Sequence, residues 1–275
     1  MTCPNRDGTL DSRGCIFCAG GSGDFAEKPD LSVFNQIEKA KLRIKNKMHG
    51  NRFIAYFQSY TNTYAPLQKL KALFYKAASH PDIVGLSVAT RPDCIDKDTA
   101  DLLGEINAVK PVFVELGLQT CREDIADFIR RYYKNDAYER AVEYLSAKNI
   151  HTVAHIIFGL PGEDEHDMLN SVRYVIKSGA QGIKIHLLYV LKGTDLQKLY
   201  LSGAFDCLDK LQYIGLIADA INIMPPDMVV HRITGDAPKK LLIAPLWSAD
   251  KKRVLNDINR FFEQNNVVQG KYYQK

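Results

Sequence analysis

Three of the six cysteines in this 275-residue chain lie within its first 18 residues, and their side chains could hold an inorganic centre. Cys3 is followed, after a loop that carries Gly8 and Gly14, by Cys15 and Cys18. Because glycine adopts backbone conformations that other residues avoid, this loop can fold back and bring three thiolates together. The spacing therefore indicates a metal or cluster site.

Several kinds of site could use these cysteines. A structural zinc ion needs four ligands, and the next cysteine is Cys94 and the first histidine His49. A disulfide needs an oxidising compartment and normally an even set, and a thioredoxin-like pair leaves Cys3 unexplained. An iron–sulfur cluster with three thiolate ligands accounts for all three cysteines and leaves one iron open to a small molecule. Three unrelated loop cysteines are the plain alternative.

The run Cys3 … Cys15-x-Phe17-Cys18, with an aromatic residue before the last cysteine, resembles the cluster motif of radical S-adenosylmethionine (SAM) enzymes. The first gap is wider than in the commonest form. The motif with this wider gap is similar to the variant found in the branch related to the elongator catalytic subunit, specifically in the bacterial YhcC/YtqA-type proteins. Residues 2–8 and 20–25 carry that closer match. The resemblance implies that Cys3, Cys15 and Cys18 ligate a [4Fe-4S] cluster whose open iron binds SAM, with the cofactor supplying the radical chemistry.

The resemblance covers roughly residues 2–245. The segment 60–63 (YTNT) occupies the place where the family holds the methionyl amino group. The segment 115–119 (ELGLQ) is similar to a strand motif of the anaerobic coproporphyrinogen oxidase and elongator branches, and 155–163 (HIIFGLPGE) looks like the adenine-binding strand. The SAM-binding residues that the resemblance implies are Phe17, Thr61, Asn62, Arg91, Glu115, Gln119, His155, Gly159 and Lys184.

These segments also have structural interpretations. The turn at Asn62 could need only the special conformation that Asn tolerates. Glu115 and Gln119 point to one face of a strand, but the buried carboxylate could instead pair with Arg91 or Lys184. Both cations suit the SAM carboxylate or an anionic substrate. Weaker candidates for binding these anionic groups are His186, His231 and Arg232. A lone histidine on a strand is more often structural.

The elements that must position these residues alternate between short β-rich runs and longer amphipathic segments. Such alternation is typical of β–α units, and near-continuous apolar strands favour a parallel sheet covered by helices. No Gly-x-Gly-x-x-Gly follows a strand, which disfavours a dinucleotide-binding sheet. Strands are expected at 53–57, 83–88, 112–116, 152–157, 182–188 and 228–231. Helices are expected at about 31–48, 66–79, 97–108, 136–148, 165–178, 207–222 and 250–264.

The predicted fold class is α/β, and the resemblance implies a partial (β/α)6 TIM-like barrel of the radical SAM type. Polar residues follow the strands at their carboxyl ends, where barrels build active sites. In the family the cluster loop follows the first strand, but only Met1 and Thr2 precede Cys3 here. We therefore expect a barrel without its first strand, by truncation or a misplaced start codon, with an open apolar edge. Residues 1–245 should form the barrel and 246–275 a helical extension.

Composition excludes several classes of protein. A hydrophobic content of 46% and a charged content of 25% are those of a soluble globular protein. No run approaches the about 20 apolar residues of a membrane span, and no signal peptide begins the chain. Unpaired cysteines in a cluster-like arrangement predict a reducing, cytoplasmic location. The net charge of +4 permits an anionic partner.

The resemblance implies a radical SAM enzyme, and its branch is associated with remodelling the wobble uridine of tRNA from carboxymethylaminomethyl to aminomethyl. The chain leaves no room for the acetyltransferase domain of the elongator subunit, so acetyl transfer is not expected. Expected partners are tRNA, with a flipped-out base in the barrel mouth, and a reductant such as flavodoxin or ferredoxin. Lys239–Lys240 and Lys251–Arg253 could hold phosphates. The alternatives are an enzyme for a small metabolite and a non-catalytic iron–sulfur or RNA-binding module.

Overall fold

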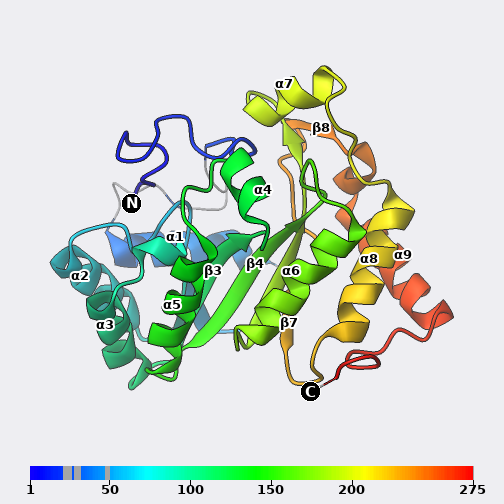
Figure 1. Ribbon diagram of the computed structural model, residues 1–275. Helices are drawn as coiled ribbons and strands as arrows, with labels where there is room; N and C mark the ends of the chain where they lie inside the picture. The colour runs from blue at the N-terminus through cyan, green and yellow to red at the C-terminus, as the bar shows by residue number, and fades with distance from the viewer. Residues whose placement is uncertain (21–26, 28–31, 47–49, 275) are drawn as a thin grey trace.

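A curled parallel sheet organises the molecule (Figure 1). The computed structural model describes residues 1–20, 27, 32–46 and 50–274. Six strands lie in the order β1-β2-β3-β4-β5-β7, and β6 and β8 form a separate antiparallel pair. All neighbours in the main sheet run parallel, as consecutive β–α units require. The strands are β1 (Phe53–Phe57), β2 (Ile83–Thr90), β3 (Val112–Gln119), β4 (His151–Phe158), β5 (Gly182–Leu187), β6 (Val190–Leu191), β7 (Val229–Arg232) and β8 (Leu242–Ala244).

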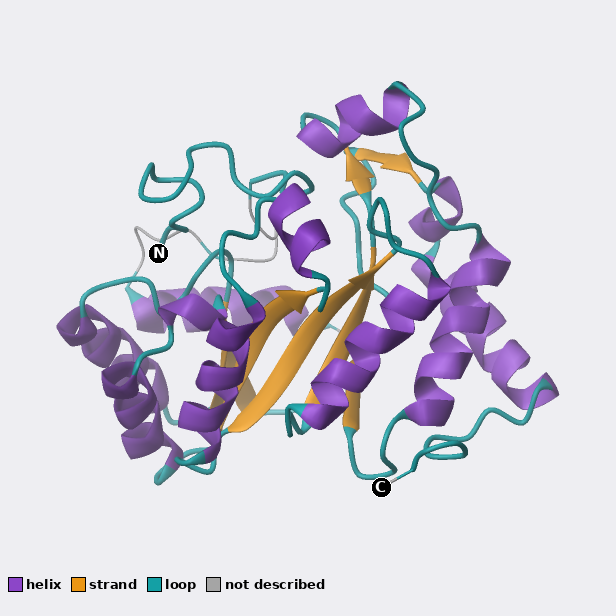
Figure 2. Ribbon diagram, in the orientation of Figure 1, coloured by secondary structure: helices purple, strands orange, loops and turns teal. Residues whose placement is uncertain are grey.

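Helices form the outer layer of the half-barrel (Figure 2). Helices α2, α3, α5 and α6 pack directly on the sheet, and α8 packs on α6. Their apolar faces join the sheet residues in one large core, to which α8 contributes along most of its length. The helices are α1 (Val33–Ile44), α2 (Leu67–Ala78), α3 (Lys97–Asn107), α4 (Glu123–Phe128), α5 (Asn135–Ser146), α6 (Glu165–Lys177), α7 (Asp195–Leu201), α8 (Lys210–Ile223) and α9 (Lys251–Gln264).

Local sequence signals explain where several helices begin. The Asp164 carboxylate accepts from the Asp167 backbone at 2.8 Å, and the Asp167 side chain accepts from the Asp164 backbone, forming a capping box at the start of α6. Asp209 and Gln212 form the same motif before α8. These caps satisfy backbone donors that a helix start otherwise leaves unpaired.

The predicted α/β half-barrel is confirmed. Every predicted strand is present, and every predicted helix is present with ends that differ by a few residues. Residues 31, 47 and 48 of the first predicted helix, and most of the 20–25 segment, lie outside the described residues. The sequence missed α4, α7 and the β6–β8 pair, which are short.

The sheet is open at β1. Within the described residues, β1 pairs only with β2, and Ile54 and Tyr56 of β1 are 51% and 41% exposed. The open edge expected from the sequence is therefore present on this side. None of the described helices has the length and apolar character that crossing a bilayer requires.

Candidate functional site

Two adjoining cavities lie at the carboxyl ends of the strands. The first chamber, about 440 Å³, is lined by Cys3, Cys15 and Cys18 together with residues of β3 and β4. The second chamber, about 750 Å³, is lined by residues of β5, β7 and the turn after β1. The two share wall residues that include Tyr60, His155, His186 and Tyr189, so a molecule in one chamber can contact a molecule in the other.

The cysteine loop folds back as its glycines predict. Gly8 and Gly14 have φ values of +90° and +78°, which favour glycine. A side chain at Gly14 would also come within 2.9 Å of the Arg6 guanidinium. The Arg6 guanidinium donates to the Cys18 carbonyl at 2.6 Å, and the Gly14 amide donates to the Asn5 carbonyl at 2.7 Å. These contacts close the loop and place all three cysteines at the first chamber.

At least two of the three sulfurs lie farther apart than the ligands of a single zinc ion. All six cysteines are free thiols, so none of these three forms a disulfide. Around one tetrahedral zinc ion, thiolates lie about 3.8 Å apart, because each Zn–S bond is about 2.3 Å. Among the described residues, the sulfurs of Cys3, Cys15 and Cys18 do not all fall within 4.8 Å of one another. A cluster binds each thiolate through a different iron and accepts this wider spacing.

Burial and charge at these cysteines favour a cationic occupant. Burial raises the pKa of the Cys15 thiol to about 11, and the neighbouring Cys18 and Cys3 thiols raise it further. Three thiolates brought this close repel one another unless a positive centre lies between them. The donor set and its surroundings thus fit an iron–sulfur cluster.

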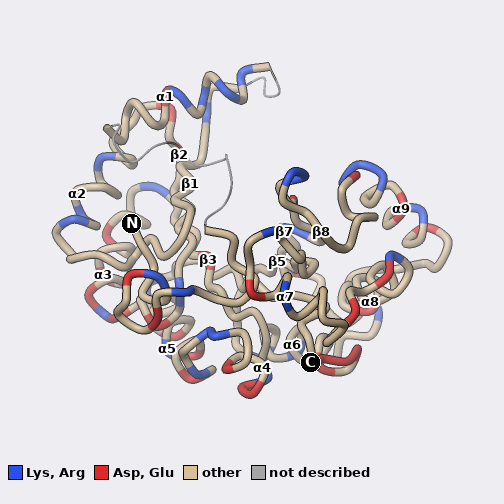
Figure 3. The backbone as a smooth tube through the Cα atoms, turned by 90° about the horizontal axis from the view of Figure 1, so that it is seen from above, with Lys and Arg blue, Asp and Glu red and all other residues tan. Residues whose placement is uncertain are grey.

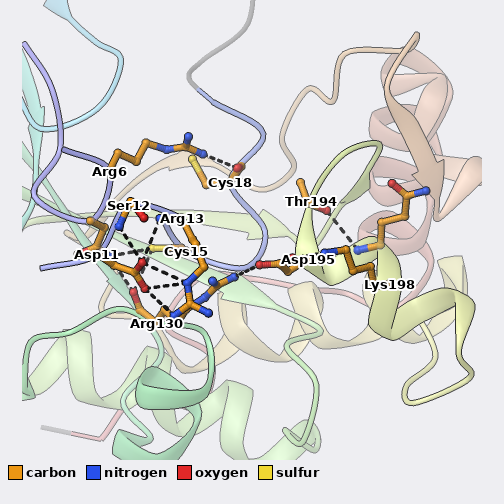
Figure 4. A network of polar contacts seen from close by, with 12 residues as sticks. Arg6, Asp11, Ser12, Arg13, Cys15, Cys18, Arg130, Thr194, Asp195 and Lys198 are labelled. Atoms are coloured by element: carbon orange, nitrogen blue, oxygen red, sulfur yellow. Dashed lines mark hydrogen bonds and ion pairs between the residues drawn. The ribbon is translucent and has the colours of Figure 1, made fainter. Parts of the chain in front are cut away.

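Asn5 anchors the loop to the rest of the fold, a role that sequence reasoning missed. It is fully buried, and its Nδ2 donates to the Arg130 carbonyl at 2.7 Å and lies 3.5 Å from the Cys15 sulfur. The Arg130 guanidinium pairs with Asp195 of α7 at 2.5 Å, as Figure 4 shows. The cysteine loop is therefore held between the end of α4 and the start of α7. The available signal in the sequence was the position of Asn5, two residues after Cys3. Its burial, which requires hydrogen-bond partners, is visible only in the structure.

The structure brings most of the sequence-predicted SAM residues to the chambers. Lys184 lines the second chamber, whereas Asn62 and Gly159 line neither. The Asn62 amide instead donates to the carbonyls of Phe57, Ser59 and Ala89 and so fixes the turn after β1. The predicted SAM residues that line the first chamber are Phe17, Thr61, Arg91, Glu115, Gln119 and His155.

Glu115 lies at the centre of a buried polar network. Its carboxylate accepts from Tyr56 at 2.7 Å and Ser87 at 2.8 Å, and contacts His155 at 2.9 Å and Lys184 at 2.6 Å. Burial alone would raise the pKa of Glu115, but His155 and Lys184 outweigh it, and the pKa is well below its usual range. The salt bridge with Lys184, one of the two structural alternatives for Glu115, is thus present.

Burial sets the charge state of the nearby histidine and tyrosine. It lowers the pKa of His155 despite the neighbouring Glu115, and it raises the pKa of Tyr56. Both side chains are therefore neutral at neutral pH. The charged groups of the network are therefore Glu115 and Lys184, and their opposite charges balance each other.

Arg91 and Gln119 also line the first chamber. The Arg91 guanidinium pairs with Asp93 through two hydrogen bonds of 2.9 and 2.7 Å and lies 4.8 Å from the ring centre of Tyr133. Gln119 has a φ of +63° and follows an irregularity in the β3–β4 register after Gly117. Glu115 and Gln119 still face the same chamber, as strand alternation predicts, although the strand is not regular between them.

The chain is similar to known proteins along nearly its whole length. A family model described as the radical SAM superfamily matches residues 12–175, and one described as a radical SAM C-terminal domain matches residues 180–264. YtqA of Bacillus subtilis is 44% identical over 99% of this chain and 85% of its own length. A tRNA uridine(34) acetyltransferase of Methanocaldococcus jannaschii is 27% identical over 58% of this chain and 30% of its own.

Among solved structures, the archaeal Elp3 of Methanocaldococcus infernus matches with a TM-score of 0.74 and 16% sequence identity. The match covers 86% of this chain and 60% of that one. At this identity the likeness concerns the fold alone.

Proposed function

This chain belongs to the radical SAM superfamily, whose cofactors are a [4Fe-4S] cluster and SAM, and we propose that it modifies the wobble uridine of tRNA. The specific reaction proposed is conversion of a carboxymethylaminomethyl side chain to aminomethyl. The observation that carries the proposal is the second chamber, a cavity with charged side chains in its lining that opens beside the cysteine-lined one and shares its wall. Similarity to a protein named a tRNA uridine(34) acetyltransferase supports tRNA as the substrate.

The residues that would hold the cofactors are those at the first chamber. Cys3, Cys15 and Cys18 would ligate the cluster, and SAM would bind beside it, in a cavity of the size usual for small-molecule sites. Bound there, the cofactors would supply radical chemistry for hydrogen abstraction from the substrate. The SAM-binding roles proposed at this chamber belong to Phe17, Thr61, Arg91, Glu115, Gln119 and His155. Lys184 would act from the second chamber, whereas Asn62 and Gly159 line neither chamber and are given no direct contact with SAM.

The chain's own residues would orient and shield these groups. The Tyr60 hydroxyl donates to the Gly20 carbonyl at 2.6 Å, and the Arg6 guanidinium lies 6.0 Å from the Tyr60 ring centre. The turn after β1 is thereby tied to the cysteine loop. This contact holds Tyr60 in the wall that the two chambers share.

The charge distribution supports an anionic macromolecule as the partner. Lys239, Lys240, Lys252 and Arg253 are exposed on the segment between β7 and β8 and at the start of α9. Figure 3 shows basic segments of α1, the β7–β8 connection and α9 on one side of the molecule. Cations arranged in this way attract nucleic-acid phosphates. A small-metabolite enzyme would be favoured by a closed, apolar mouth, whereas the second chamber is lined by Lys184, Arg232 and Asp236.

Nucleoside analysis tests the proposal. The gene would be deleted in its own organism, and tRNA nucleosides would be measured by mass spectrometry. We expect carboxymethylaminomethyl uridines to accumulate at the expense of aminomethyl forms, with restoration by the wild-type gene and none by Cys15→Ser. Unchanged wobble uridines would reject the tRNA reaction, and a purified enzyme that still cleaves SAM would then point to a small metabolite.

A further inference from the structure

Among the described residues that line the second chamber, one positive charge lacks a counter-charge. Three formally charged side chains line it, namely Lys184, Arg232 and Asp236. Lys184 pairs with Glu115 at 2.6 Å, and Asp236 pairs with Lys251 at 2.5 Å. Within the part of the chain that the structure describes, Arg232 has no hydrogen bond or ion pair. The Arg232 side chain is only partly buried, so its guanidinium is free to pair with an anionic ligand in the chamber.

An irregularity in the sheet directs Arg232 toward this chamber. Ile183 pairs with Val230 in the β5–β7 register, but the next residue, Lys184, pairs with Arg232. The extra residue on β7, His231, breaks the alternation of its side chains. The Arg232 charge contributes to the lowered pKa values of His155 and His186, which lie on the inner face of β4 and β5.

His186 presents a second unsatisfied polar group to the same space. Its Nε2 is buried and has no hydrogen-bond partner, and the residue lines both chambers. Burial, together with the neighbouring His155 and the charges of Arg232 and Lys184, lowers its pKa well below the usual value. The ring is therefore neutral and can donate a hydrogen bond from Nε2. Buried polar atoms of this kind normally have partners, so a ligand is expected there.

We propose that the second chamber is a carboxylate subsite, in which Arg232 pairs with a substrate carboxylate and His186 Nε2 donates a hydrogen bond to it. A single uncompensated cation suits a monoanion, and a guanidinium matches the two oxygens of a carboxylate. This inference rests on the proposed function, because it assigns the carboxylate of the carboxymethylaminomethyl group to this subsite. It adds that recognition of that carboxylate belongs to residues outside the proposed SAM-binding set.

A pair of small probes tests the subsite without tRNA. N-benzylglycine carries an aromatic ring, a methylene, an amine and a carboxymethyl group, and benzylamine is the same molecule without the carboxymethyl group. Binding of each to the cluster-loaded protein with SAM would be measured by calorimetry under anaerobic conditions. We expect N-benzylglycine to bind at least about tenfold more tightly than benzylamine, since hydrogen bonds to charged groups are the stronger ones.

Variants assign that preference to the two residues. Arg232→Gln should abolish the preference and His186→Asn should reduce it. Arg173→Gln, the same change at an exposed position of α6, should leave the preference intact. Equal binding of the two probes by the wild type, or a preference that survives Arg232→Gln, would overturn the subsite.

The tRNA assay separates this inference from the proposed function. If the wild type prefers N-benzylglycine through Arg232 but converts no tRNA, the carboxylate subsite stands and the tRNA reaction fails. If tRNA is converted and Arg232→Gln converts it as well as the wild type, the subsite fails and the tRNA reaction stands.

Discussion

The Nζ atom of Lys184 lies 2.6 Å from Oε2 of Glu115, and this ion pair lies between the two chambers. Glu115 lines the first chamber and Lys184 lines the second. Both side chains are nearly buried, with 6% and 11% of their surfaces exposed. The pair thus forms part of the wall that separates the proposed SAM site from the proposed substrate site.

Removing the negative charge of this pair should destabilise the protein. Glu115→Gln leaves Lys184 buried without its counter-charge, and breaking such a pair typically costs about 3–5 kcal/mol. Urea denaturation of the cluster-free protein would measure the loss. The double variant Glu115→Gln/Lys184→Met should recover much of it, and Glu105→Gln on the surface of α3 should change little. A single Glu115→Gln variant as stable as the wild type would show that the pair is not needed for folding.

The buried histidines should make stability depend on pH. The pKa values of His155 and His186 in the folded protein lie below their usual value of 6.5, mainly because both side chains are buried. The unfolded chain therefore binds protons first as the pH falls below about 6.5, and the folded state loses stability. One such proton changes the free energy of unfolding by about 1.4 kcal/mol per pH unit.

Denaturation midpoints between pH 8 and pH 5 would measure this slope in the cluster-free protein. His186→Asn should make the slope shallower, whereas His166→Asn, at an exposed position of α6, should leave it unchanged. A slope that is the same in all three proteins would contradict the assignment to His186.

Loss of Asn5 should weaken retention of the cluster. Asn5→Ala removes the hydrogen bond to the Arg130 carbonyl and the contact to the Cys15 sulfur, both of which hold the cysteine loop in place. We expect faster release of iron to a chelator and a loss of about 1–3 kcal/mol in stability. The control is Asn256→Ala, an exposed asparagine on α9. Equal rates of iron release from the two variants would show that Asn5 does not support the site.

Neutralising the basic residues near the second chamber should weaken tRNA binding in a salt-dependent way. Lys239→Gln/Lys240→Gln removes two exposed cations, and each lost phosphate contact should reduce the slope of log affinity against log salt by about 0.7–0.9. Filter binding over a range of salt concentrations would measure it. Arg140→Gln on α5 serves as the control for a change in net charge. The same slope in both variants would place the tRNA contacts elsewhere.

The sequence predicted the fold well because its elements have strong periodic signals. Apolar strands at regular spacing and capped amphipathic helices locate β1 to β5, β7 and the longer helices. The elements missed are short, and tertiary contacts hold them: β6 pairs with β8, and α7 is tied to the cysteine loop through Arg130 and Asp195.

The site was only partly predictable from the sequence. The cysteines are recognisable from their spacing, but the role of Asn62 in holding backbone carbonyls depends on where the strand ends meet. The uncompensated charge of Arg232 depends on two ion pairs formed by residues far apart in the chain. No local pattern carries that information.

The most direct test of the central claim is formation of 5′-deoxyadenosine by the anaerobically reconstituted protein with SAM and dithionite. We predict that the wild type and the control Cys207→Ser bind a cluster and produce 5′-deoxyadenosine, and that Cys3→Ser, Cys15→Ser and Cys18→Ser do not. A fully iron-loaded wild type that yields no 5′-deoxyadenosine, or a Cys15→Ser variant that yields as much as the wild type, would contradict the account.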